Sequence, residues 1–107
     1  MNSGFMRLIV FFDLPVKTVG EKKVYMQFRK DLLKNGYYMI QYSVYGRLCN
    51  GVDSVNKFVN RLQKIAPSTG SVRVLSVTEK QYASMIIMSG DKKPREKDVK
   101  YFQLSFF

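Results

Sequence analysis

The chain has 107 residues, of which 46% are hydrophobic, so it suits one folded domain and not a disordered segment. Eighteen Lys and Arg residues against eight Asp and Glu residues give a formal net charge of +10, which favours a polyanionic partner such as nucleic acid. The absence of histidine excludes Ser-His and Cys-His catalysis and metal ligation by imidazole. With one cysteine and no apolar run long enough to cross a bilayer, we expect a cytoplasmic protein without an intrachain disulfide.

The most informative stretch of the sequence is the apolar run from Leu8 to Phe12, which ends at Asp13. Its β-branched and aromatic residues predict a strand buried on both faces in the middle of a sheet. Because an unpaired carboxylate is costly to bury, we expect Asp13 where the strand leaves the sheet and its head reaches water. Such a position is often part of a ligand site in α/β proteins, although aspartate is also common as a turn cap.

A first amphipathic helix is predicted over 19–34. Thr18 and Glu21 have the spacing of a capping box at its start, and Gly36 suits its end. The side chains expected to face the sheet are those of Val24, Tyr25, Phe28 and Leu32. The lysines and arginines of this segment would then lie on its outer side.

A second helix is predicted after the turn at 50–51, and Pro67 ends it. Either Asp53 or Ser54 is suited to cap its first turn. Its apolar face is well marked and comprises Val55, Phe58, Val59, Leu62, Ile65 and Ala66. Basic residues line the opposite side, so both helices should present cationic outer surfaces.

The remaining apolar segments predict strands. Residues 37–48 form either one long strand or a tight hairpin, and the periodicity does not decide between them. Residues 71–77 alternate as a strand does, Thr78 caps a helical turn over 79–83, and 85–88 predict another short strand.

The last part of the chain differs in composition. We divide the chain into a folded domain over 1–88 and a basic connector with a C-terminal strand over 89–107. In residues 101–107 the aromatic and apolar side chains alternate with polar ones. Because a free aromatic strand invites aggregation, we expect it to pair with a sheet edge, of its own chain or of a partner in a dimer.

The order of these elements predicts an α+β protein with a ferredoxin-like βαββαβ sandwich and an extra C-terminal strand. Without histidine or a phosphate-binding glycine loop, carboxylate chemistry remains, and Mg²⁺ favours such oxygen ligands. One carboxylate per chain is a weak site, so two Asp13 residues would have to meet across a homodimer to hold one ion against a phosphodiester. Cys49 has no histidine to act as its base and is expected to be an inert thiol.

Three segments, in order and at fitting distances, resemble the CRISPR-associated protein 2 family, the small partner of the CRISPR spacer integrase. They are the strand at 7–15 ending in Phe-Asp-Leu-Pro, the Gln-Tyr-Ser-Val-Tyr motif at 41–45 after Gly36, and Leu-Ser-Val-Thr-Glu-Lys-Gln-Tyr at 75–82. They look most like members from type II systems. The resemblance implies a ferredoxin-like homodimer, in which the C-terminal strand of each protomer extends a sheet, and a hairpin turn within 41–45.

The resemblance also implies a site. In this family the aspartate that ends the first strand is the assigned metal ligand and proposed catalytic residue, and Asp13 matches it, with Mg²⁺ as the ion. Phe12 stands where a tyrosine is common, and Ser43 belongs to the motif expected near the aspartate. Some nuclease members carry arginines early in the first helix, where this chain has Lys22, Lys23 and Tyr25, and Phe12 lacks a hydroxyl. These departures weaken the case for cleavage more than that for DNA binding, since lysines can also hold phosphates.

Two functions follow from the resemblance and the charge. The leading interpretation is a homodimeric protein of CRISPR adaptation (spacer acquisition) that bridges integrase dimers of CRISPR-associated protein 1 and binds protospacer duplex DNA through its backbone. The alternative is a Mg²⁺-dependent endonuclease that cleaves RNA or double-stranded DNA with Asp13. A module that stacks single-stranded RNA on exposed sheet aromatics ranks below both, because the chain lacks an RNP1-like sequence.

Overall fold

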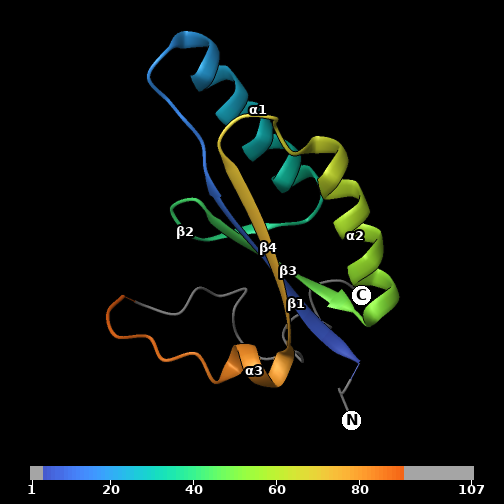
Figure 1. Ribbon diagram of the computed structural model, residues 1–107. Coiled ribbons are helices and arrows are strands. Elements are labelled where there is room, and N and C mark those ends of the chain that lie inside the picture. Colours follow the sequence, from blue (N-terminus) through green and yellow to red (C-terminus); the bar gives the residue numbers. More distant parts are fainter. Residues whose placement is uncertain (1–3, 91–107) are drawn as a thin grey trace.

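Helices and strands alternate along the chain around one antiparallel sheet. The structure, a computed structural model, describes residues 4–90. Its elements are β1 (Phe5–Asp13), α1 (Val19–Lys34), β2 (Tyr38–Gln41), β3 (Val44–Asn50), α2 (Val52–Ile65), β4 (Ser71–Thr78) and α3 (Glu79–Ala83). The strand order is β2-β3-β1-β4, and every neighbouring pair is antiparallel (Figure 1). This is the ferredoxin-like α+β arrangement that the sequence predicts.

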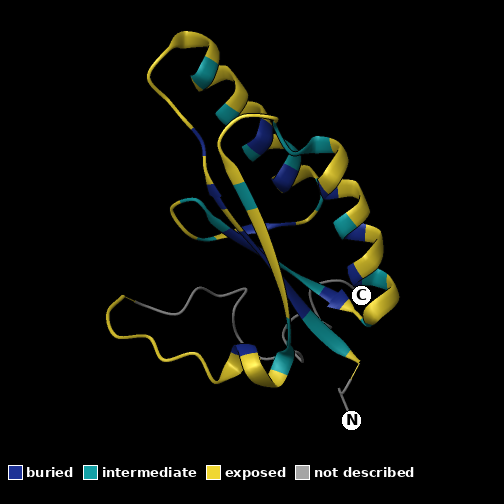
Figure 2. Ribbon diagram, in the orientation of Figure 1, coloured by how far each residue is buried: buried dark blue, intermediate teal, exposed yellow. Residues whose placement is uncertain are grey.

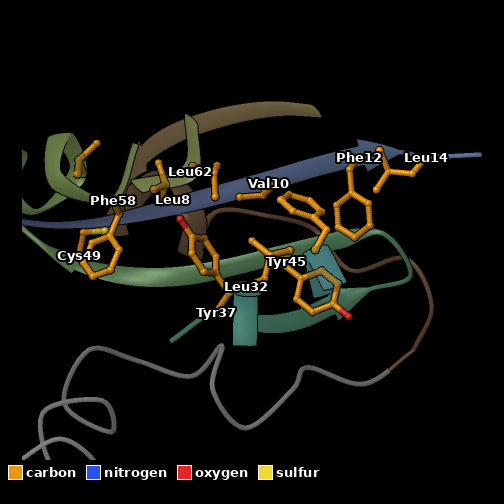
Figure 3. Packing of buried hydrophobic residues seen from close by; sticks show 12 residues of the cluster. Leu8, Val10, Phe12, Leu14, Leu32, Tyr37, Tyr45, Cys49, Phe58 and Leu62 are labelled. Atoms are coloured by element: carbon orange, nitrogen blue, oxygen red, sulfur yellow. The ribbon is translucent and has the colours of Figure 1, made fainter. Parts of the chain in front are cut away.

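The core lies between one face of the sheet and the two long helices (Figure 3). Its buried side chains are Leu8, Val10, Phe12, Leu14, Phe28, Leu32, Tyr37, Tyr45, Cys49, Val55, Phe58 and Leu62. On α1 the prediction is wrong at Val24, which is exposed. The inward face of this helix is centred on Phe28 and Leu32, with Tyr25 packed against the core, so Val24 falls at its border.

The boundaries of α2 differ from the prediction at its start. Gly51 is the N-cap residue, no side chain caps the helix, and Asp53 lies in the first turn. The predicted caps, Asp53 and Ser54, are therefore wrong. Gly51 has φ 95° and ψ 178°, a conformation that only glycine adopts easily, so the chain turns into the helix before either polar residue is reached. None of the helices within residues 4–90 is long and apolar enough to cross a membrane.

The segment after α1 is a hairpin and not one long strand. β2 and β3 pair across a tight turn at 42–43, as the resemblance implies. The strand predicted over 85–88 is wrong: these residues form no strand and are exposed, because the chain runs away from the sheet after α3 (Figures 1 and 2). The predicted C-terminal strand over 101–107 lies outside the described residues, as does nearly all of the connector.

Among the elements that the structure describes, only α3 covers the second face of the sheet, opposite α1 and α2, and it does so at one end. On β1, Arg7 is fully buried there, whereas Phe11 is 40% exposed. The prediction that β1 is buried on both faces is therefore wrong at Phe11. The reason is that α3, which contacts β1 and β4, lies beside the N-terminal end of β1 (Figure 1), where its Tyr82 ring covers Arg7 and does not extend to Phe11.

A polar cluster closes the end of the sheet that α3 covers. The Nε and Nη2 atoms of Arg7 donate to the two carboxylate oxygens of Glu79 at 2.5 and 2.9 Å. Nη1 donates to the hydroxyl oxygen of Tyr38 at 2.6 Å, and the guanidinium lies 4.5 Å from the ring centroid of Tyr82. A bidentate carboxylate and a full set of partners compensate for the burial of this charge. The cluster thereby ties α3 and β2 to β1.

Two adjacent tyrosines at the start of β2 differ in what their hydroxyls meet. The hydroxyl of Tyr37 is buried and has no hydrogen-bond partner among residues 4–90. Burial of this group raises the pKa of Tyr37. The hydroxyl of Tyr38, in contrast, accepts the hydrogen bond from Arg7. The same chemical change at these two positions should therefore have different consequences.

We predict that Tyr37→Phe leaves the free energy of unfolding unchanged or raises it by up to about 1 kcal/mol, because it removes an unpaired buried hydroxyl. Tyr38→Phe, the matched control, should lower it by about 1.5–3 kcal/mol, because a charged donor loses its acceptor. Urea unfolding followed by circular dichroism measures both values. Equal destabilisation by the two substitutions would contradict the assignment.

Candidate functional site

Asp13 is the last residue of β1 and lies at the uncovered end of the second face. Its side chain is exposed, and no hydrogen bond or ion pair joins it to another residue within 4–90. Its position where the strand leaves the sheet is the predicted one. The alternative role as a turn cap is not observed, because the carboxylate bonds to no backbone N–H of the described chain.

A hollow of about 330 Å³ opens beside Asp13. Its lining residues come from β1, the β2–β3 turn, the first residue of β3 and β4, and they are Phe11, Phe12, Asp13, Tyr42, Ser43, Val44, Ser71 and Arg73. In the pairing of β1 with β4, Asp13 is opposite Ser71 and Phe11 is opposite Arg73. Because side chains alternate along a strand, Asp13 and Arg73 are diagonal neighbours on the same face of the sheet.

The β2–β3 turn forms one wall of this hollow. Ser43 has φ 63° and is the only non-glycine residue with positive φ in the described chain. Its carbonyl oxygen accepts a hydrogen bond from the N–H of Phe12 at 3.1 Å, which fixes the turn beside the end of β1. Ser43 and Asp13 therefore line one hollow. The family resemblance implies that the motif containing Ser43 lies near the aspartate, and the structure places it there.

An exposed aromatic ring projects from the same turn. Tyr42 is 76% exposed and stacks on Tyr25 of α1, with ring centroids 6.2 Å apart and an interplanar angle of 25°. The neighbouring hydroxyl of Tyr25 raises the pKa of the Tyr42 hydroxyl. Phe12 points the other way, into the core, where its ring lies 5.1 Å from that of Phe28. Phe12 thus contributes packing and no hydroxyl group to the site.

Gly70 determines how closely β4 approaches Asp13. It precedes β4 with φ 73°, and a Cβ placed on it would lie 2.5 Å from the carbonyl oxygen of Asp13 and 3.1 Å from Cα of Leu14. Both atoms belong to the backbone, so neither can move aside easily. Glycine at this position lets Ser71 and Arg73 enter the sheet next to the end of β1.

Asp13 of one protomer is an incomplete site for a hard cation. Residues 4–90 contain no group of three or more His, Cys, Asp or Glu side chains that would hold a metal ion. The other oxygen atoms in the hollow include the neutral hydroxyls of Ser43 and Ser71. Mg²⁺ binds through one or two carboxylates together with waters and phosphates. The residues present fit Mg²⁺ if a second carboxylate joins them, and a second copy of Asp13 is one such group.

A second surface with a chemical character of its own covers α1 and α2. The exposed cations on these helices are Lys22, Lys23, Lys30, Lys34, Lys57, Arg61 and Lys64. Arg29 is partly buried instead, and its Nε donates to the hydroxyl oxygen of Tyr45 at 2.9 Å. Since both helices pack on the core face of the sheet, this basic surface and the Asp13 hollow lie on opposite sides of the molecule.

Sequence reasoning alone did not identify Arg73, Tyr42 or Gly70 as parts of the site. The alternation of residues 71–77 places Arg73 on one face of its strand, but only the pairing register brings it beside Asp13. Cys49 is buried, and burial raises the pKa of its thiol, in agreement with an inert role.

The fold and the site define a class of small ferredoxin-like proteins with a lone carboxylate at the open end of the central strand. The family model described as CRISPR associated protein Cas2 matches residues 6–85. A relative from Acidovorax ebreus (strain TPSY), named CRISPR-associated endoribonuclease Cas2, is 51% identical over 102 residues, which cover 95% of this chain and 100% of that protein. The chain belongs to the Cas2 family.

Further comparisons agree with this assignment. A relative of the same name from Ligilactobacillus salivarius (strain UCC118) is 47% identical over 87 residues, which cover 81% of this chain and 86% of that protein. A solved structure described as "Crystal structure of cas2" superposes with a TM-score of 0.56 at 23% sequence identity, covering 89% of this chain and 99% of that chain. This structural similarity supports the fold.

We predict that Gly70→Ala lowers the free energy of unfolding by about 2 kcal/mol, because a positive φ costs a non-glycine residue about 1–2 kcal/mol and the added Cβ clashes with backbone. Gly20→Ala in α1 is the matched control: its Cβ would meet only Thr18 Oγ1 at 3.9 Å, so stability should rise by about 0.5–1 kcal/mol. Thermal and urea unfolding measure both. A Gly70→Ala protein as stable as the wild type would refute the close approach.

Proposed function

We propose that this protein acts in CRISPR adaptation as a homodimer that bridges integrase dimers of CRISPR-associated protein 1 and holds protospacer duplex DNA through its backbone. Membership of the Cas2 family supports the role in a CRISPR system. The observation that carries the DNA-binding part is the basic surface of α1 and α2. Cations on helix surfaces suit phosphates, and phosphate contacts give affinity without sequence readout.

The open edge of β4 supports the dimer. Within residues 4–90, β4 pairs only with β1, and the apolar side chains of Val74 and Leu75 are exposed on it. An exposed edge strand with apolar side chains is an aggregation hazard unless another strand covers it. The aromatic segment at 101–107 of a second copy is suited to add a strand there. A homodimer would also bring a second Asp13 to the assembly.

We predict that affinity for a blunt DNA duplex falls steeply with salt, with a slope of about −0.9 per phosphate contact, and does not depend on sequence. Fluorescence anisotropy at several salt concentrations measures the slope. Lys22→Gln or Lys30→Gln should make it shallower by about one, because each removes a phosphate contact. Lys80→Gln, on α3 at the other side of the sheet, is the charge-matched control and should leave it unchanged. A flat salt dependence would rule out backbone binding.

A second function is supported by the Asp13 hollow. We propose that the protein is also a Mg²⁺-dependent endonuclease whose metal ligand is Asp13, with RNA as its first substrate class and double-stranded DNA as the alternative. The specific observation is an exposed carboxylate that no residue of 4–90 pairs with and that lines an open hollow. Relatives named endoribonuclease agree with this reading. One Mg²⁺ shared by the Asp13 residues of two protomers would supply charge neutralisation and a water of lowered pKa.

We predict that Asp13→Asn, a nearly isosteric change, lowers Mg²⁺-dependent cleavage by at least about 100-fold. Loss of an outer-shell partner of a metal already costs up to about 100-fold, and loss of a direct ligand should cost at least as much. Duplex binding should persist, because Asp13 lies away from the basic surface. Cleavage of RNA and duplex DNA with and without Mg²⁺, beside anisotropy for binding, measures both. Spacer acquisition in cells that is unchanged by Asp13→Asn supports the bridging role. A wild-type protein that binds duplex but cleaves neither substrate rules out the nuclease.

A further inference from the structure

Arg73 is the one cation among the residues that line the Asp13 hollow in the described chain. It belongs to the edge strand β4 and is exposed. Its side chain forms no hydrogen bond or ion pair with another residue within 4–90, and its cross-strand partner is Phe11, which is apolar. The described part of the fold therefore does not use this guanidinium.

Asp13 and Arg73 face the same hollow without neutralising each other. They are diagonal neighbours on adjacent strands, at a typical Cα separation of about 7–8 Å, which long side chains can span. Nevertheless they form no ion pair, so their charged atoms are more than 4.0 Å apart. A direct surface ion pair would gain little, which leaves both charges available to a ligand. The arrangement suits a ligand that carries a cation and anionic oxygens together.

We propose that Arg73 is the phosphate-binding residue of the Asp13 site and donates to the non-bridging oxygens of the phosphodiester from the β4 side. This inference rests on the proposed endonuclease function, because it assigns a second residue to that site. A guanidinium offers a planar fork of donors that matches phosphate geometry. Asp13 would bind the metal ion at one wall of the hollow, and Arg73 would bind the phosphate oxygens at the other wall.

The rest of the lining is consistent with this assignment. The hydroxyls of Ser43 and Ser71, which also line the hollow, are neutral and do not compete with either charge. The turn wall is fixed by the hydrogen bond from Phe12 to Ser43 and by the stacking of Tyr42 on Tyr25. A nucleic-acid strand that enters the hollow would therefore meet a rigid wall opposite β4.

The first test measures binding without metal. A short fluorescein-labelled single-stranded RNA is titrated in EDTA over a salt series with wild type, Arg73→Gln, Arg73→Lys and Lys80→Gln. Arg73→Gln should weaken binding by about 10-fold and make the salt slope shallower by about one, because one phosphate contact is lost. Lys80→Gln removes the same charge and should change neither. Arg73→Lys should retain the slope, because it keeps the charge but lacks the fork.

The second test compares cleavage in Mg²⁺. Arg73→Gln should raise KM and lower kcat/KM, whereas Asp13→Asn should abolish turnover.

Equal affinities and slopes for Arg73→Gln and Lys80→Gln overturn the inference, and so does a wild type that binds no RNA. Cleavage that needs Asp13 but is unaffected by Arg73→Gln leaves the endonuclease in place and refutes the role of Arg73. Cleavage unaffected by Asp13→Asn, with the slope still changed by Arg73→Gln, refutes Asp13 as the metal ligand and leaves Arg73 as a phosphate-binding residue. Melting temperatures and light scattering check that each variant folds and assembles as the wild type does.

Discussion

The alternation of side chains along β1 is the constraint on which the rest of the structure depends. β1 lies between β3 and β4, so both of its edges are occupied by backbone hydrogen bonds. From Leu8 to Leu14 its even-numbered residues enter the core, and Asp13 ends the odd-numbered series. A slip of one residue would bury the carboxylate and expose Phe12, which the hydrophobic core forbids. The packing of the core thus holds Asp13 at the open end of the sheet.

The charged side chains at the two ends of the second face have different roles. At one end, α3 covers Arg7, whose guanidinium donates to Glu79 of α3 and to Tyr38 of β2, so the charge stabilises the fold. At the other end no helix of residues 4–90 covers the sheet, and the side chains of Asp13 and Arg73 form no ion pair or hydrogen bond within that range. A paired charge stabilises a position, whereas an unpaired charge at the surface is available to a ligand. The length of α3 therefore decides which part of the face is structural.

The features that the sequence predicted well depend on local chemistry. The capping boxes after Thr18 and Thr78 start their helices where predicted, because a cap and its partner are three residues apart. Two of the errors arise from tertiary contacts. Exposure at Phe11 depends on how far α3 reaches, and no strand forms over 85–88 because the chain leaves the sheet. The hairpin of β2 and β3 was indicated by family resemblance and not by periodicity.

The site was predictable to the extent that one strand contains it. Asp13 stands out because it ends a continuous apolar run, and its place follows from the cost of burying a carboxylate. Arg73 is sixty residues away in sequence, and the register that brings it opposite Phe11 is set by strand pairing, which no local pattern encodes. The same holds for Gly70, whose importance depends on the backbone it meets.

The separation of the two faces also bears on how such a protein changes over generations. Substitutions among the outward residues at the open end, such as Phe11, Ser71 and Arg73, disturb little of the packed interior. Selection can therefore act on this surface without first compensating for lost stability. Descendants of one ancestor can keep the same fold and assembly while a chemical activity at the open end is gained, altered or lost. Shared architecture among such chains is thus a poor guide to shared chemistry, which must be determined from the residues at this end of the sheet.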